Sequence, residues 1–235
     1  MKKIIYILVT VMMILSLSAC GEKKEENESN NQSKDQTVIS DNKDTEVQKE
    51  KITVDDVKKA KETPASLFEY VEVDGGVSIT AFNGADEIVS IPTMIDGKTV
   101  VAIGNNAFIN NDSMKGIKIA DTVKVIGEGA FMNCTELLIV VFGNEVESIE
   151  QYAFSGSKKL YLVELNNGLK NMGWGSFGLT NLTEIEIPSS VIVIDYPFNV
   201  NNEEHYITIV GEAGSMAEQF VNESEDEDHL KFRAK

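Results

Sequence analysis

Residues 123–142 read VKVIGEGAFMNCTELLIVVF, and the pattern of this stretch recurs along the chain with a fixed period. Its central Ala-Phe pair belongs to a column of phenylalanines spaced 23 residues apart, at positions 108, 131, 154 and 177. A Met or Leu column keeps the same step until Leu182, where one residue is missing, and a degenerate fifth copy contains Phe198. Because several apolar columns persist over four copies, the sequence predicts an internal repeat with a period typical of solenoids.

Each copy also contains a short segment whose side chains are expected to point alternately into and out of the core, as in Ile117-Lys118-Ile119. This alternation is typical of a strand that is buried on one face. One repeat cannot bury that face alone, so neighbouring copies must stack, strand beside strand, about 4.8 Å apart. Because the crossovers return each strand in the same direction, we predict a right-handed coil of short parallel strands with little helix.

Two columns receive specific roles in this coil. The phenylalanine column is expected to stack along the interior. Gly104, Gly127 and Gly173, each after an Ile or Met, suit either a positive φ or a close approach of backbone.

The pattern Ile-Gly-x-x-Ala-Phe, followed by Leu and then by a strand, resembles the BspA-type leucine-rich repeat of bacteria, and residues 131–137 match it best. The resemblance implies an N-terminal cap hairpin and first strand over 63–92, turning at Asp74-Gly75-Gly76, and repeats over 93–210. It also implies a C-terminal cap helix beginning after Ser215 and an acidic tail, together over 211–235. Proteins of this type are commonly bacterial surface proteins, and some act as adhesins or bind host proteins.

The first twenty residues have the pattern of a targeting signal. Lys2 and Lys3 precede an apolar run, and Leu17-Ser18-Ala19-Cys20 resembles the lipobox of bacterial lipoproteins. We therefore predict a signal peptide over 1–19 and diacylation of Cys20, which anchors the protein in a membrane. An ordinary secretory signal with a chance cysteine is the alternative.

Residues 20–62 are predicted to be the lipidated cysteine and a disordered tether, because this segment is highly charged and lacks aromatic residues after Cys20. Within it, Thr53 to Glu62 is compatible with a short helix, since Thr53 and Asp56 have the spacing of a capping box.

Composition excludes several function classes. The 235 residues include 21 Lys and Arg against 38 Asp and Glu, a net charge of −17, which argues against a nucleic-acid-binding surface. Two cysteines and two histidines argue against a Cys/His zinc cluster and a disulfide scaffold. No cofactor or metal is expected, and Cys134 is interpreted as a buried small apolar residue.

Catalysis has little support in the sequence. A hydrolase would need His205 or His229 beside a nucleophile, and no motif supplies that context. The acidic tail lacks the spacing of a calcium loop and is interpreted as solvated. Its residues are Glu223, Glu225, Asp226, Glu227 and Asp228.

Outward residues of successive strands are expected to line one exposed face. We predict that this face binds a partner through Lys118, Ile139, Val141, Leu162, Glu164, Glu184, Glu186, Tyr206 and Thr208. Three of these positions, Ile139, Val141 and Leu162, are apolar where the pattern demands nothing apolar, and an exposed apolar patch rimmed by charge often marks an interaction site. The competing interpretation is that β-branched residues favour strands. The neighbouring carboxylates favour a basic or amide-rich protein.

The sequence therefore favours a lipid-anchored, non-enzymatic recognition protein outside the cell, which presents a concave strand face to an extracellular or cell-envelope protein. An envelope scaffold or spacer without a specific ligand is the alternative, and a hydrolase ranks third.

Overall fold

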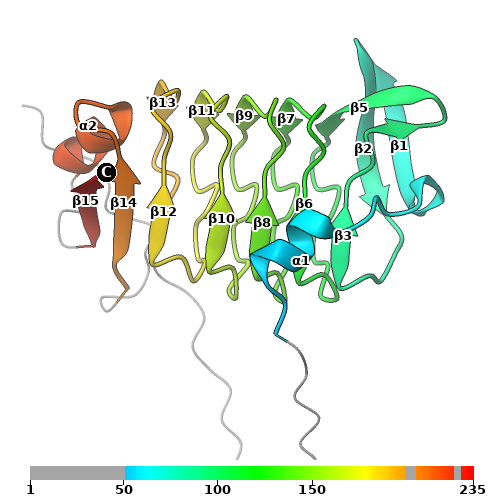
Figure 1. Cartoon of the computed structure of the whole chain (residues 1–235), viewed down its shortest axis with the longest axis horizontal. Coiled ribbons are helices and arrows are strands. Elements are labelled where there is room, and N and C mark those ends of the chain that lie inside the picture. Colours follow the sequence, from blue (N-terminus) through cyan, green and yellow to red (C-terminus); the bar gives the residue numbers. More distant parts are fainter. Residues whose placement is uncertain (1–50, 199–204, 225–228) are drawn as a thin grey trace, which may run out of the picture. The chain divides into compact units, whose positions relative to one another are not determined.

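Stacked turns of parallel strands make up most of the protein, as the repeat predicted (Figure 1). The computed structural model describes residues 51–198, 205–224 and 229–235. Each central turn contributes one strand to each of two rows that run along the solenoid. The predicted signal peptide, Cys20, the tether as far as residue 50 and the acidic positions 225–228 lie outside the described residues.

One sheet carries the Ile column of the repeat. Its order is β1-β2-β5-β7-β9-β11-β13, with β4 beside β5, and the pairs from β2 to β13 are parallel. Ile126 and Ile149 lie opposite each other in this row, and Met172 continues it. The strands are β1 (Phe68–Val73), β2 (Gly76–Phe82), β4 (Met94–Ile95), β5 (Lys98–Ile103), β7 (Val125–Ile126), β9 (Ser148–Ile149), β11 (Asn171–Met172) and β13 (Val193–Ile194).

The second row of strands consists of two sheets. The first has the order β10-β8-β6-β3 and the second has the order β12-β14-β15, and all their pairs are parallel. The strands are β3 (Ile88–Ser90), β6 (Gly116–Lys118), β8 (Ile139–Val141), β10 (Leu162–Glu164), β12 (Glu184–Glu186), β14 (Ile207–Gly211) and β15 (Leu230–Ala234).

The ladder stops between β10 and β12, at the short repeat. In the preceding turn, the Tyr161 N–H donates to Leu138 O (3.1 Å), whereas here the Asn181 N–H donates to Leu160 O (2.9 Å). Because one residue is missing before Leu182, the backbone hydrogen bonds between this turn and the preceding one have a different register from those between the other turns.

Phenylalanine rings stack through the interior, as predicted. The ring centroids of Phe108 and Phe131 are 4.8 Å apart, those of Phe131 and Phe154 are 5.0 Å apart, and those of Phe154 and Phe177 are 5.3 Å apart. Phe198 continues the stack at 6.2 Å from Phe177. The column is buried and belongs to one core cluster that runs along the solenoid.

The glycines after the Ile or Met column serve a close backbone approach. A Cβ at Gly127 would lie 2.8 Å from Asn105 N, and one at Gly173 would lie 2.8 Å from Gln151 N. Neither position has a positive φ, so the structure decides between the two roles that the sequence left open.

Both ends of the solenoid are capped. At the N-terminal end, β1 and β2 form an antiparallel hairpin that turns at Asp74 and Gly75, where Gly75 has φ 83°. At the other end lies the short helix α2 (Met216–Glu223), as expected. Ser215 stands at its N-cap, but the Ser215 side chain makes no cap hydrogen bond; Glu218 accepts from Gly214 N instead.

Two expectations about the terminal segments are wrong. Residues 51–62, predicted as part of a disordered tether, belong to the same compact unit as the solenoid, and they contain the helix α1 (Val54–Lys59) where a short helix over Thr53 to Glu62 was expected. Thr53 and Asp56 form the capping box that holds its start. A short 3₁₀ turn, η1 (Ala65–Leu67), follows. The last residues are not all tail, because β15 pairs with β14.

Candidate binding face

The predicted face is assembled from β6, β8, β10, β12 and β14, and its residues lie in register. Ile139 lies between Gly116 and Leu162, and Val141 lies between Lys118 and Glu164. In the second sheet, Glu184 lies opposite Thr208, and Glu186 lies opposite Val210. Tyr206 precedes β14 and is exposed. Eight of the nine predicted residues thus lie on five neighbouring strands, with a break between β10 and β12, and Tyr206 lies directly before β14.

Two of the three apolar positions of this face, Ile139 and Val141, are buried, so the expectation of an exposed patch is wrong for them, while Leu162 is half-buried. Ile139 is 0% and Val141 8% exposed, because α1 lies over them (Figure 1). Val57, on α1, is itself 0% exposed and forms one buried cluster with the two strand residues. Ile52, Val54, Ile88, Leu138, Tyr161 and Leu162 pack around that cluster.

Val57 occupies a hollow above a glycine. A Cβ built on Gly116 would lie 2.6 Å from Val57 Cγ2 and 3.8 Å from Ile88 Cγ1. Glycine at this position therefore makes the room that the Val57 side chain fills. The sequence offered one signal, since Gly116 interrupts a row that is otherwise occupied by Ile88, Ile139 and Leu162.

The carboxylates of the face contact basic residues from the two ends of the described chain. Lys58, on α1, lies 2.7 Å from Glu164. From β15, Arg233 lies 2.7 Å from Glu184, and the last residue, Lys235, lies 2.7 Å from Glu186. The hydrogen bond to Glu186 raises the pKa of Lys235. All these groups are largely solvent-exposed, so each pair contributes little to stability.

A groove of about 500 Å³ opens where the ladder stops, between β10 and β12. Leu162 and Ile185 contribute apolar surface to it, and Glu164, Glu184 and Glu186 contribute carboxylates. The missing residue of the repeat thus coincides with an acidic groove next to the patch that α1 covers.

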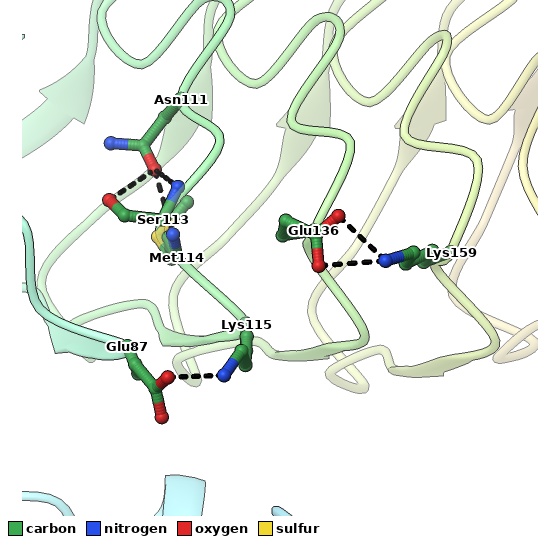
Figure 2. A network of polar contacts seen from close by, with 7 residues as sticks. All are labelled: Glu87, Asn111, Ser113, Met114, Lys115, Glu136 and Lys159. Carbon is green, nitrogen blue, oxygen red and sulfur yellow. Dashed lines mark hydrogen bonds and ion pairs between the residues drawn. The ribbon is translucent and has the colours of Figure 1, made fainter.

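The flank of the face is tied together by ion pairs between successive turns. Figure 2 shows Glu136 paired with Lys159, at 2.6 Å, and Glu87 paired with Lys115 just before β6. In the same view, Asn111 Oδ1 accepts from the Met114 N–H (2.9 Å). The two ion pairs join neighbouring turns, whereas the Asn111 hydrogen bond lies within one turn.

The described residues hold no group of three or more His, Cys, Asp or Glu side chains placed for a metal ion. His205 Nε2 is 2.8 Å from Leu182 O, so this ring nitrogen is engaged with backbone. The ring of His229 lies 5.9 Å from that of Tyr206. In the same described part, no helix has the length and apolar character needed to cross a membrane.

Cys134 has the buried position that was expected of it. It is a free cysteine, its Sγ–H donates to Phe108 O (3.1 Å), and burial raises the pKa of its thiol to about 12. Ser157, one period later, donates to Phe131 O (3.0 Å) in the same way. In these two turns, the side chain donates to a backbone carbonyl of the preceding turn, which is a structural role.

Residues 77–204, more than half of the chain, match the family model "BspA type Leucine rich repeat region" in six copies. The chain belongs to the BspA-type leucine-rich repeat family. This family and fold are typically non-enzymatic scaffolds. No curated protein sequence matches the chain.

Solved structures share the fold of this BspA-type protein. A leucine-rich repeat protein of T. pallidum, TpLRR, is 23% identical with a TM-score of 0.58, over 74% of this chain and 84% of the other. One from Bacteroides ovatus is 26% identical with a TM-score of 0.50, over 61% of this chain and 45% of the other. The pneumococcal vaccine antigen PcpA is 14% identical with a TM-score of 0.50, over 71% of this chain and 47% of the other.

Proposed function

We propose that this BspA-type protein is a recognition protein on the outside of a bacterial cell, which binds an extracellular or cell-envelope protein through its strand face. The observation that carries the proposal is the acidic groove between β10 and β12, next to the outward strand residues. A rigid solenoid with such a groove supplies shape and charge for binding. The family, whose members are typically scaffolds rather than enzymes, supports the same proposal.

The partner that suits this groove is a basic protein segment. Glu164, Glu184 and Glu186 already hold Lys58, Arg233 and Lys235 of the chain itself. Because these pairs are exposed and weak, basic side chains of a partner can replace them at low cost.

The test is capture of extracellular and envelope proteins by the immobilised chain with chemical cross-linking, followed by mass spectrometry. We compare the wild type with the variant Glu184→Lys/Glu186→Lys. The matched control is Glu128→Lys/Glu145→Lys, which makes the same charge change at exposed residues of other turns. Loss of one defined partner in the face variant alone supports the proposal, and equal capture by all three proteins contradicts it.

A lipid anchor at Cys20 is part of the proposal. The support is the sequence layout of a short basic start, an apolar run and the Leu17-Ser18-Ala19-Cys20 quartet. Detergent phase partitioning of the protein from intact cells checks it. The wild type should enter the detergent phase and Cys20→Ala the aqueous phase; equal partitioning would remove the anchor.

A scaffold without a specific ligand is the second candidate, and one observation favours it. Other parts of the chain already contact most of the strand face. The helix α1 covers the apolar residues of the face, and basic residues of the chain pair with the carboxylates of the face. For a pure spacer, the capture experiment should yield no protein whose bound amount saturates as its concentration rises.

A further inference from the structure

We propose that the surface beneath α1 is a docking site for a short amphipathic helix of a partner protein, and that α1 is a displaceable cover that occupies this site in the free protein. This inference rests on the proposed recognition function and names the part of the face and the chemistry of the partner.

The first support is the fit of a helical side chain into a defined hollow. Val57 enters the space above Gly116 and packs on Ile139 and Val141. Val54, three residues earlier on the same side of α1, packs against the edge of this cluster. The surface is thus shaped for a helix that presents a small apolar side chain, as in helix-in-groove recognition.

The second support is that the cover is separable from the fold. The cluster of Val57, Ile139 and Val141 is distinct from the core cluster that contains the phenylalanine stack. Lifting α1 therefore leaves the solenoid core intact. The chain after α1 is held independently, because Thr63 N donates to Ser90 O (2.9 Å) and Thr63 Oγ1 accepts from Ser90 N (3.0 Å).

The third support is that the cover is weakly held. The helix has six residues, and only Val57 is buried. A helix of this length is not stable by itself in water. The Lys58–Glu164 pair has side chains that are 47% and 40% exposed, so it contributes little. The burial of Val57 on Ile139 and Val141 keeps α1 in place, and its short connection to Thr63 raises its local concentration over the hollow.

The occupant defines the chemistry of the partner. Lys58 pairs with Glu164, and Lys51 Nζ lies 5.8 Å from the centroid of the Tyr161 ring. A competing helix therefore needs a valine-sized residue for the hollow, followed directly by a lysine. A second lysine six residues before the valine, in the chain that precedes the helix, would reach the aromatic ring as Lys51 does.

The experiment uses the full chain and a fluorescein-labelled synthetic peptide with the sequence of residues 51–62. In the chain variant Val57→Asp, the charged side chain cannot enter the apolar hollow, so the site becomes free. Amide hydrogen exchange at residues 54–59 reports this release. The peptide should bind this variant roughly tenfold more tightly than the wild type, whose own α1 competes. Asp55→Asn, on the exposed side of α1, should behave as the wild type.

A size exchange between peptide and chain makes the test specific for the hollow. With alanine at position 116, its Cβ would clash with Val57 Cγ2 but lie 3.8 Å from Val57 Cβ, which is an ordinary contact. In the Val57→Asp background, the native peptide should therefore bind best to the chain with Gly116. The peptide with Val57→Ala should bind better than the native peptide to the chain with Gly116→Ala.

The outcomes separate this inference from the proposed function. Three results would overturn the helix-docking site: no peptide binding to any variant, equal binding to wild type and Val57→Asp, or the same peptide ranking on both chains. The capture experiment with Glu184 and Glu186 tests the proposed function separately from these results. A wild-type chain that dimerises by exchanging α1, seen by sedimentation, would replace the partner protein with a second copy. Peptide binding with the exchanged ranking, without capture of any protein, would support the docking site and refute the recognition role at the acidic groove.

Discussion

Replacing Phe154 by alanine should remove the central ring of the interior stack. Phe154 is 0% exposed, and its ring lies 5.0 Å from that of Phe131 and 5.3 Å from that of Phe177, nearly parallel to both at 4° and 3°. Truncating a buried phenylalanine costs about 3–5 kcal/mol, and aromatic pairs are worth about 0.5–1.5 kcal/mol beyond their buried area. With a ring on each face, we expect a loss near the upper limit, about 5 kcal/mol, which is a large part of the usual stability of a domain.

Urea titration followed by fluorescence of Trp174 measures this loss. Trp174 is the only tryptophan, and its ring lies 5.0 Å from Tyr152 in the neighbouring turn, so its emission reports on the stacked repeats. The matched control is Phe154→Leu, which keeps much of the volume and should cost less than half as much as alanine. A cost for Phe154→Ala below about 0.5 kcal/mol, the range of surface substitutions, would refute the picture of a continuous stacked core.

Three further outcomes follow from named contacts. Gly173→Ala would place its Cβ 2.8 Å from Gln151 N, so we expect a loss of about 1–3 kcal/mol and a lower melting temperature; an unchanged melt would contradict the close approach. The thiol of Cys134, whose pKa is raised to about 12, should resist alkylation at pH 8 in a Cys20→Ala chain and react once urea unfolds it; equal rates in both states would contradict its burial. Hydrogen bonds from Thr53 lower the pKa of Asp56, so the capping box should stabilise α1 at neutral pH and lose this effect as the pH falls through the lowered pKa. Reduced protection of amides 54–59 against hydrogen exchange, relative to the intrinsic rate at each pH, would show the loss. The variant Asp56→Asn should lack this pH dependence, and the same pH dependence in the variant would contradict the role of Asp56.

Much of the fold was predictable because a solenoid repeats one local solution. Each turn contacts only its neighbours, so the same side chains recur at one period and can be recognised without long-range information. Phe131 and its equivalents were assigned in this way, whereas the hairpin turn at Gly75 and the position of α2 were implied by the family resemblance. The capping box of Thr53 and Asp56 was also visible, because its two residues lie three positions apart.

The candidate site was predicted only in part. The strand positions and their order followed from the repeat, and the acidic residues 164, 184 and 186 lie on the expected face. The exposure of Ile139 and Val141 was wrong, and the groove between β10 and β12 was not foreseen, although the missing residue before Leu182 was its signal.

By itself, the sequence determined the period, the interior column and the caps of this protein. Only the tertiary structure decided what lies over the strand face. The segment that covers it, around Val57, is more than 80 residues away from Ile139 in the chain and outside the repeat, so no periodicity connects the two. The position of α1 depends on shape, because the Val57 side chain fills a hollow above Gly116. This hollow exists only after the turns have stacked.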